Sequence, residues 1–311
     1  MRSPMKKDFL AIADFSTEEL QDMLENAIAM KKEWREHGNA AILKGKSLAM
    51  VFQKPSLRTR VSFERGMEQL GGSALYLSPQ EIGLGQRESI ADVARVLSGY
   101  VDAVMARVFS HDHILELAKW SSVPVINGLS DYNHPSQAMA DAMTILEEFG
   151  TLKDIRVAFL GDGNNVAISL MYICAKLGAH FIFSGPEGYQ LPQADVEKAS
   201  QIAKASSGSV SIIPDPKQAV AGVDVIYTDT WTSMGQEEEA KQREAVFPAY
   251  QVNEEIVDLA HEHVIVLHCL PAHRGQEITD PVADGPHSRL FPQAHNRMHA
   301  QKAILAYLMA D

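Results

Sequence analysis

The sequence predicts an α/β protein with two lobes, each a parallel sheet flanked by helices. The length of 311 residues is about twice that of a typical domain, which favours two lobes. Short apolar runs alternate with helical stretches along the chain, a pattern typical of parallel sheets covered by helices. The alternation is interrupted by one long helix, predicted at residues 135–150, and then begins again.

The first lobe is predicted to hold four strands. Ser16 and Glu19 form a capping box, which starts a helix that extends to about Arg35. The strands are predicted at residues 47–52, 74–77, 103–106 and 123–126, and the helices between them at 59–70, 89–99 and 114–120.

The second lobe repeats the alternation and is followed by one more helix. Its strands are predicted at residues 155–160, 181–184, 210–213, 225–228 and 264–268, with helices between them. A last helix is predicted at about 296–308. Each polar cluster of interest follows the end of a predicted strand, where open parallel sheets bind ligands.

Composition excludes several classes of function. The net charge of −12 argues against nucleic acid or an anionic membrane as a partner, since both require a basic face. Two cysteines are too few for a disulfide framework. The chain shows no signal peptide and no apolar run of the roughly 18 residues that a membrane helix needs. A cytoplasmic protein is therefore expected.

The turn from Ser56 to Arg60 follows the first predicted strand and opens a helix. Backbone N–H groups at a helix start, a hydroxyl group and the guanidinium groups of Arg58 and Arg60 suit a phosphate dianion. The alternative is a solvated basic turn with a Ser/Thr cap.

Two further positions in the first lobe have open interpretations. Arg107 ends an almost wholly apolar strand, so it either pairs with a carboxylate or faces a ligand. His134 precedes Pro135 and is biased toward an extended backbone. Its imidazole and the amide of Gln137 suit a carbonyl oxygen and an amino group, although His134 also fits a helix cap.

In the second lobe, Gly161-Asp162-Gly163 suggests a dinucleotide fingerprint, but Val166 stands where the third glycine is required.

Asp229 follows a strand and suits an ammonium group, although its segment also fits a surface loop. Cys269 either assists proton transfer or packs. Cys174 is predicted to lie in the core, and no metal site is expected, because no other cysteines have ligand spacing.

Taken together, these motifs resemble those of the aspartate/ornithine carbamoyltransferase family. The shared motifs are the S-x-R-T-R turn at Ser56 to Arg60, His134-Pro135-x-Gln137, the Asp229 to Gly235 segment and His268-Cys269-Leu270-Pro271, in the family's order. The likeness covers nearly the whole chain. The last two motifs are typical of the ornithine branch.

The resemblance implies a substrate for each lobe. Residues 1–142 would bind carbamoyl phosphate, residues 143–295 would bind L-ornithine, and 296–311 would form a C-terminal helix that packs back on the first lobe. Carbamoyl phosphate would contact Ser56, Leu57, Arg58, Thr59, Arg107, His134, Gln137, Cys269, Leu270 and Arg297. Ornithine would contact Asn165, Asp229, Ser233 and Met234. The catalytic residues would be Arg107, His134, Asp229 and Cys269.

The resemblance also implies a homotrimer, or an assembly of trimers, with shared active sites. A loop at about residues 78–88 of one subunit would complete the donor site of the next. The family often has a glutamine where this chain has Gly83, and Gln80 or Gln86 would replace it. His295 stands where many relatives have an acid.

The expected reaction is direct attack by the neutral δ-amine of ornithine on the carbamoyl carbon. No metal or organic cofactor is expected, because the mixed anhydride of the donor already carries the activation. One alternative is a sister carbamoyltransferase that acts on another amine, such as putrescine. The other is a non-catalytic homologue, which would be expected to lose Arg58, Arg107 or His134, and all three are present.

Overall fold

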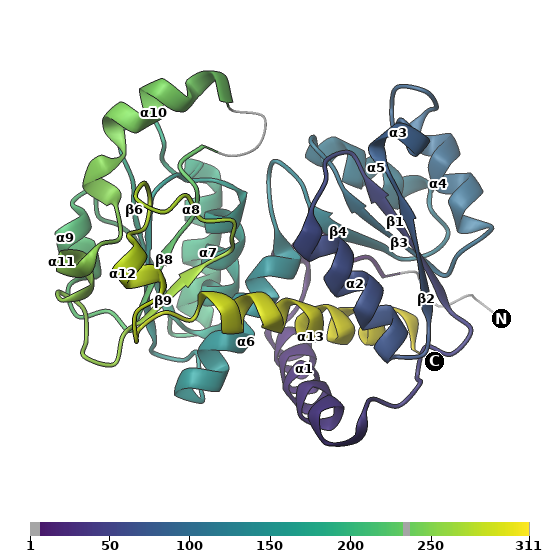
Figure 1. Ribbon diagram of the computed structural model, residues 1–311, viewed down its shortest axis with the longest axis horizontal. Helices are drawn as coiled ribbons and strands as arrows, with labels where there is room; N and C mark the ends of the chain where they lie inside the picture. The colour runs from purple at the N-terminus through teal and green to yellow at the C-terminus, as the bar shows by residue number, and fades with distance from the viewer. Residues whose placement is uncertain (1–6, 233–236, 311) are drawn as a thin grey trace. The chain divides into compact units, whose positions relative to one another are not determined.

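The structure is a computed structural model that describes residues 7–232 and 237–310 (Figure 1). The chain divides into two compact units. Unit 1 consists of Met1–Ala140 and Asn296–Asp311, and unit 2 of Asp141–His295. Each unit contains a parallel sheet flanked by helices, which confirms the predicted fold class.

The sheet of unit 1 has four parallel strands in the order β2-β1-β3-β4. They are β1 (Ser47–Phe52), β2 (Ser73–Leu77), β3 (Ala103–Arg107) and β4 (Val125–Leu129). The chain winds from β1 to β2 on one side and then returns to β3 on the other side of β1. The ends of β1 and β3 therefore form a topological switch point, the place where such sheets bind ligands.

Helices cover this sheet and follow the sequence signals closely. They are η1 (Ile12–Asp14), α1 (Thr17–His37), α2 (Leu57–Gln69), α3 (Pro79–Ile82), α4 (Ile90–Ser98), α5 (His111–Trp120) and the start of α6 (Pro135–Phe149). The capping box of Ser16 and Glu19 is present. Helix α3 was not predicted. A second capping box, Ser78 with Glu81, places this helical turn in the segment expected to be a loop.

The sheet of unit 2 has five parallel strands in the order β7-β6-β5-β8-β9. They are β5 (Arg156–Leu160), β6 (His180–Ser184), β7 (Ser209–Ile212), β8 (Val225–Thr228) and β9 (Ile265–His268). The helices of this unit are α7 (Asn165–Leu177), α8 (Gln193–Ala205), α9 (Pro216–Val220), η2 (Glu237–Glu239), α10 (Ala240–Val246), η3 (Pro248–Tyr250), α11 (Glu254–Val257) and α12 (Asp280–Ala283). The switch point lies between β5 and β8. Cys174, on α7, is fully buried, as predicted.

The last helix, α13 (Leu290–Met309), begins six residues before its predicted start at 296. Pro292 falls in its first turn, where the helix needs no backbone N–H donor, so the proline does not delay the start. The part of α13 within unit 1 packs on that unit. Lys31 Nζ donates to Asn296 Oδ1 at 2.7 Å, and Lys302 Nζ donates to Gln69 Oε1 at 2.9 Å.

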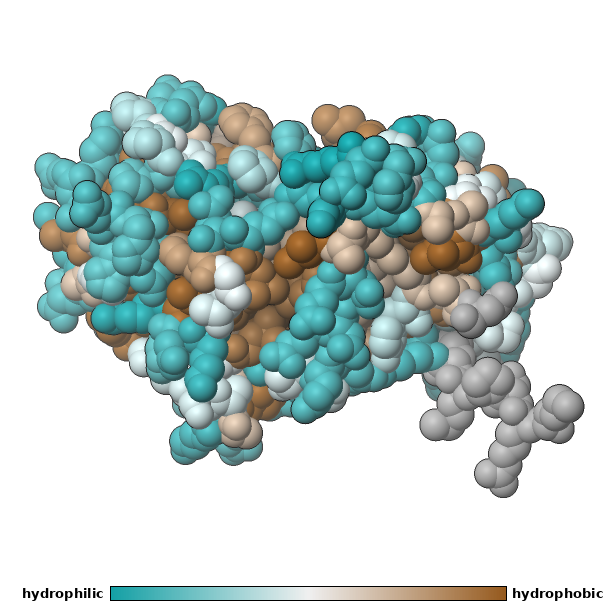
Figure 2. Space-filling model, turned by 90° about the horizontal axis from the view of Figure 1, so that it is seen from below, coloured by the Kyte–Doolittle hydropathy of each residue, from teal (hydrophilic) through white to brown (hydrophobic). Residues whose placement is uncertain are grey.

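Among residues 7–232 and 237–310, no helix is both long and apolar enough to cross a membrane. On the face drawn in Figure 2, hydrophobic and hydrophilic residues are interspersed.

Candidate active site

The switch point of unit 1 brings together Arg107 and the turn from Ser56 to Arg60, which was predicted to bind phosphate. Phe52, the last residue of β1, is in register with Arg107, the last residue of β3. The backbone N–H of Gln53 then donates to the carbonyl oxygen of Arg107 at 2.8 Å. The turn that follows Gln53 is therefore anchored beside Arg107, as the carboxyl-end rule for parallel sheets predicts.

Within this turn, Ser56 caps α2, and its Oγ accepts a hydrogen bond from Thr59 N at 3.2 Å. Thr59 is fully buried, and its hydroxyl oxygen accepts a hydrogen bond from Arg297 Nη2 at 2.9 Å. Leu57 is the first residue of α2, and its side chain is 75% exposed. Its backbone N–H is therefore the group that it would offer to a ligand at the helix start. The predicted helix cap is therefore present, and phosphate binding by this turn stays a prediction.

Arg60, the second arginine of the turn, contacts Glu64 and Tyr76. Its guanidinium group lies 4.0 Å from the ring centroid of Tyr76, and its Nε lies 3.6 Å from Glu64 Oε2. The structure therefore shows Arg60 in contact with Glu64 and Tyr76, and its part in a phosphate cradle stays a prediction.

His134 is buried near four cationic side chains of unit 1, Arg58, Arg107, Arg297 and Lys54, which form the cationic cluster. The ring is 3% exposed. Burial lowers the pKa of His134 well below its usual value, and the neighbouring Arg297, Arg107, Lys54 and Arg58 lower that pKa further. The imidazole is therefore neutral at physiological pH and can hydrogen-bond a ligand without adding charge.

The backbone of His134 also serves the start of α6. Its carbonyl oxygen accepts hydrogen bonds from Gln137 N at 3.0 Å and Ala138 N at 3.2 Å. The side chain of Gln137 is 1% exposed. The interpretation of His134 as a residue of the helix start is therefore confirmed through its carbonyl group, and ligand binding by its ring stays a prediction.

Lys54 is a member of this cluster that sequence reasoning missed. It is 8% exposed, with Nζ 5.0 Å from the ring centroid of Phe109. Burial, and then the charge of Arg107, lower the pKa of Lys54 to about 8. The only sequence signal is its position two residues after β1, because burial is not visible in the sequence.

The switch point of unit 2 is built around Asp229. Asn164 caps α7 by accepting from Val166 N at 3.0 Å and Ala167 N at 3.1 Å, and its Nδ2 donates to Asp229 Oδ2 at 2.8 Å. Asn164 was not predicted as a site residue. The predicted residue, Asn165, is the first residue of α7.

Asp229 and Cys269 are in direct contact. The Cys269 thiol donates to Asp229 Oδ1 at 2.9 Å, and Thr230 N donates to the same oxygen at 2.8 Å. Asp229 is 7% exposed, and Cys269 is partly exposed. This thiol–carboxylate pair can hold or pass one proton.

The segment after β9 is held by a buried pair, His268 and Glu277. His268 Nδ1 accepts from Leu270 N at 2.8 Å, so its proton lies on Nε2, which donates to Glu277 Oε1 at 3.1 Å. Both side chains are fully buried. Leu270 has a φ of 58°, and its bond to His268 stabilises this left-handed conformation.

The predicted ornithine residues Ser233 and Met234, with Gly235, lie outside the described residues. The chain just before them is held by Arg243, whose Nη1 donates to Trp231 O at 2.7 Å and to Asp162 Oδ2 at 2.7 Å. Arg243 gave no sequence signal, because it lies on α10, far along the chain from Asp162.

The glycine pattern at Gly161 to Gly163 has a packing cause. A Cβ atom at Gly163 would lie 2.5 Å from the backbone of Gln190 and Leu191. Glycine is therefore required at this position by a close backbone approach within unit 2, without any dinucleotide.

Within residues 7–232 and 237–310, two groups of side chains have the spacing of metal ligands. Asp229, His268 and Cys269 form one, and Asp224, His261 and His263 form the other, with ligand atoms within 4.8 Å of one another in each group. The first group belongs to the candidate active site described above.

Two doubly wound sheets carry complementary chemistry. One switch point gathers cations around a neutral imidazole, and the other holds a thiol–carboxylate pair. Such an arrangement suits an enzyme that binds an anionic, phosphorylated substrate beside a group able to handle a proton.

Comparison with known proteins identifies the family. Residues 7–147 match the carbamoyl phosphate-binding domain of aspartate/ornithine carbamoyltransferases, and residues 153–308 match the Asp/Orn-binding domain. The chain belongs to the aspartate/ornithine carbamoyltransferase family.

Individual relatives are similar over nearly the full length. The chain is 53% identical over 304 residues to ornithine carbamoyltransferase of Thermococcus kodakarensis, covering 97% of this chain and 96% of the relative. It is 50% identical over 303 residues to ornithine carbamoyltransferase of Bacillus subtilis, covering 97% and 94%. A solved structure of the Pyrococcus furiosus ornithine carbamoyltransferase matches with a TM-score of 0.95 and 52% identity, covering 97% of each chain.

Proposed function

We propose that this chain transfers the carbamoyl group of carbamoyl phosphate to the δ-amine of L-ornithine, giving L-citrulline and phosphate. The observation that carries the proposal is the neutral His134 ring among Arg58, Arg107, Arg297 and Lys54. Such a cluster suits an anionic donor whose carbonyl oxygen needs an uncharged hydrogen-bond partner. The full-length similarity to enzymes named ornithine carbamoyltransferase supports ornithine as the acceptor.

The donor half of the reaction is assigned to unit 1. The start of α2, at Ser56, Leu57, Arg58 and Thr59, binds the phosphate through backbone N–H groups, hydroxyls and a guanidinium group. Arg107, His134 and Gln137 hold the carbamoyl end, and Arg297 supports Thr59. These preformed dipoles and charges stabilise the oxyanion and the departing phosphate.

The acceptor half is assigned to unit 2. Asp229 binds the α-ammonium group of ornithine, while Asn165, Ser233 and Met234 surround the rest of the amino acid. Asn164 fixes the carboxylate of Asp229 through a 2.8 Å hydrogen bond. Cys269 and Leu270 lie near the reacting amine, held in place by His268.

The thiol–carboxylate pair is suited to proton transfer. An amine with a pKa of about 10.4 is neutral in only about one molecule in 2,500 at pH 7. Attack on the carbamoyl carbon forms the C–N bond, breaks the C–O bond to phosphate and releases one proton. Asp229 and Cys269 are placed to accept that proton or pass it on.

The function is tested by mixing the purified chain with carbamoyl phosphate and a panel of amines. We expect citrulline and phosphate in a 1:1 ratio with ornithine. Carbamoylation of putrescine in preference to ornithine would assign the chain to a sister enzyme, and no product with any amine would refute the proposal.

The need for a neutral amine predicts a pH effect. We expect kcat/KM for ornithine to rise between pH 6 and about 8.5, because the neutral fraction of the amine rises with pH. Initial rates at saturating carbamoyl phosphate measure this dependence. A flat profile, with chemistry shown to be rate-limiting, would contradict the need for amine deprotonation.

Lys54 predicts the opposite trend for the donor. Its pKa of about 8 means that the charge is present below pH 8 and is lost as pH rises above it. We therefore expect kcat/KM for carbamoyl phosphate to fall above about pH 8. Lys54→Met should lower kcat/KM for carbamoyl phosphate below pH 8 and remove the decline above pH 8. Lys44 is exposed, so the control Lys44→Met should have the same pH profile as the unaltered enzyme. Persistence of the decline in Lys54→Met would assign it to another group.

We further propose a homotrimer in which residues 78–88 of one subunit complete the donor site of the next. Gln80 and Gln86 are exposed in this segment, while Gln53 Nε2 donates to Leu84 O at 3.1 Å and anchors its base. Because both glutamine side chains are exposed, they are accessible to a second chain. We also expect a cytoplasmic location, where Cys269 would stay reduced.

Complementation tests the shared site. An Arg58 variant and a variant lacking residues 79–88 should each be inactive alone. Mixed and allowed to exchange subunits, they should regain part of the activity, because some composite sites would be intact. Mass spectrometry would verify that subunits have exchanged. If activity then does not recover, each chain holds a complete site.

A further inference from the structure

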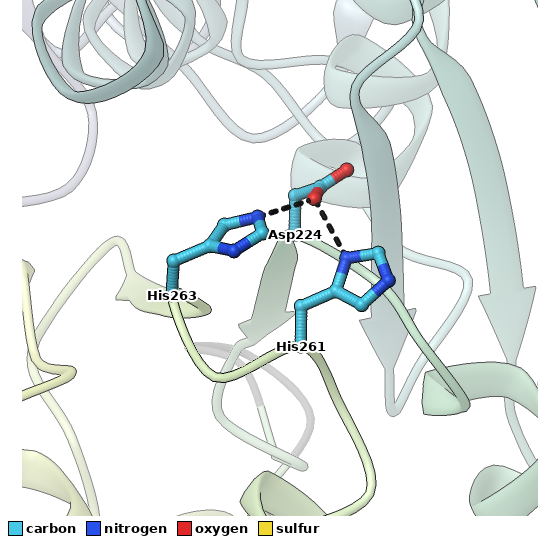
Figure 3. A group of neighbouring side chains, drawn as sticks. All are labelled: Asp224, His261 and His263. Carbon is cyan, nitrogen blue, oxygen red and sulfur yellow. Dashed lines mark hydrogen bonds and ion pairs between the residues drawn. The ribbon is translucent and has the colours of Figure 1, made fainter.

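Asp224, His261 and His263 lie together at the amino ends of two strands of the unit 2 sheet (Figure 3). Asp224 immediately precedes β8, and the two histidines lie just before β9. Because β8 and β9 are parallel neighbours, their amino ends bring the three side chains together. Neither the sequence motifs nor the proposed reaction uses this cluster.

One carboxylate oxygen is shared by both rings. Asp224 Oδ1 accepts a hydrogen bond from His261 Nδ1 at 3.0 Å and from His263 Nε2 at 2.9 Å. Both rings point toward Asp224 (Figure 3). The histidine side chains are 46% and 62% exposed, so an ion from solvent has access to these atoms.

The backbone around the cluster is fixed. His261 N donates to Val223 O at 3.1 Å, and Ile265 N donates to Asp224 O at 3.0 Å. The second carboxylate oxygen, Asp224 Oδ2, accepts from Arg156 N at 2.8 Å. This bond orients the carboxylate and leaves Oδ1 for the imidazoles, as outer partners do in metal sites.

The two rings are also held by packing. His263 meets the ring of Phe149 edge to face, with centroids 5.9 Å apart. A Cβ atom at Gly222 would lie 3.3 Å from His261 Nε2, so the glycine leaves room for this ring. The centroids of the two imidazoles are 5.1 Å apart. The three ligand atoms are therefore positioned before any ion arrives.

We propose that Asp224, His261 and His263 bind a divalent transition-metal ion of the zinc type. Two imidazole nitrogens and one carboxylate oxygen are ligands that Zn²⁺ accepts, and three protein ligands leave a fourth position for water. The ion would replace the two N–H···O bonds. His261 would bind through Nδ1 and His263 through Nε2. Each of these nitrogens must first give up its proton, either to solvent or by a tautomer shift to the other nitrogen of the same ring.

Bound metal would tie together the segments before β8 and β9 and so stabilise the folded unit. Binding to the folded state alone raises the apparent stability in proportion to the logarithm of ion concentration over Kd. The site lies at the opposite ends of these strands from Asp229 and Cys269, so its effect falls on stability.

The test must separate this site from the group that contains Cys269. Calorimetric titration with Zn²⁺ and optical titration with Co²⁺ would therefore use chelator-treated full-length protein carrying Cys269→Ser. We expect one ion per chain, a cobalt spectrum without thiolate charge-transfer bands and a higher Tm with Zn²⁺. Adding His261→Gln or His263→Gln should weaken binding by more than about 100-fold, which exceeds the usual loss for an outer-shell partner.

The exposed His37 provides a matched control, since His37→Gln should leave the Kd unchanged. Crystals of the unaltered chain soaked in Zn²⁺ should show anomalous density between Asp224, His261 and His263. Absence of that density, absence of stoichiometric binding in Cys269→Ser, or equal binding in folded histidine variants would each overturn the proposal. These outcomes are independent of the carbamoyl transfer assay.

Discussion

Arg58→Gly should reduce kcat/KM for carbamoyl phosphate by at least about 10²-fold, the size of effect that follows the loss of one main electrostatic donor. Arg58 lies in the first turn of α2, and its positive charge helps to lower the pKa of the buried His134. The measurement is the initial rate of citrulline formation at limiting donor concentration.

Arg60→Gly is the matched control, because it makes the same change two residues along the same helix. Arg60 interacts with Glu64 and Tyr76, so its loss should affect activity by only a few-fold. Circular dichroism would establish that both variants fold. A folded Arg58→Gly enzyme with nearly full activity would remove Arg58 from the donor site.

The second large effect concerns the acceptor. We expect kcat/KM for ornithine to exceed that for putrescine by at least about 10³-fold, and aspartate to be inert. A site built to bind polar groups rejects an analogue that lacks them, because buried polar groups are then left unpaired. Putrescine has the reacting amine but lacks the α-carboxylate, and aspartate has no δ-amine.

Two variants locate this preference. Replacing Ser233-Met234-Gly235 with three alanines should remove most of it, and Asp229→Asn should weaken ornithine use by loss of a charged hydrogen-bond acceptor. The rate with putrescine should fall less in the alanine variant than the rate with ornithine. Equal use of both amines by the unaltered enzyme would contradict the acceptor assignment and leave the donor assignment intact.

The fold was predictable because most strands are short, largely apolar runs separated by helical stretches. Every predicted strand overlaps an observed one, and β1 and β8 have the predicted bounds. Strand β4 begins two residues and ends three residues later than predicted. The start of α13 was placed too late, because proline in a first helical turn looks like an interruption in sequence. Helix α3 was missed, because one turn closed by Ser78 and Glu81 is too short to show periodicity.

The candidate site was predictable where chemistry follows a strand end directly, as at Arg107 and Asp229. It was less predictable where burial or a distant partner decides the role. Lys54 has a lowered pKa only because the fold buries it beside Arg107. Asn164, beside the predicted Asn165, contacts Asp229 because capping α7 turns its side chain toward β8. Glu277 meets His268 through folding of the segment after β9.

We assign the donor to the start of α2 and the amino acid to Asp229. A crystal structure with a bisubstrate analogue, in which a phosphonoacetyl group is attached to the δ-nitrogen of L-ornithine, tests this assignment most directly. We predict the phosphonate at Ser56, Arg58 and Thr59, the acetyl oxygen near Arg107 and His134, and the α-ammonium group at Asp229. A phosphonate bound away from α2, or an α-ammonium group bound away from Asp229, would contradict the account.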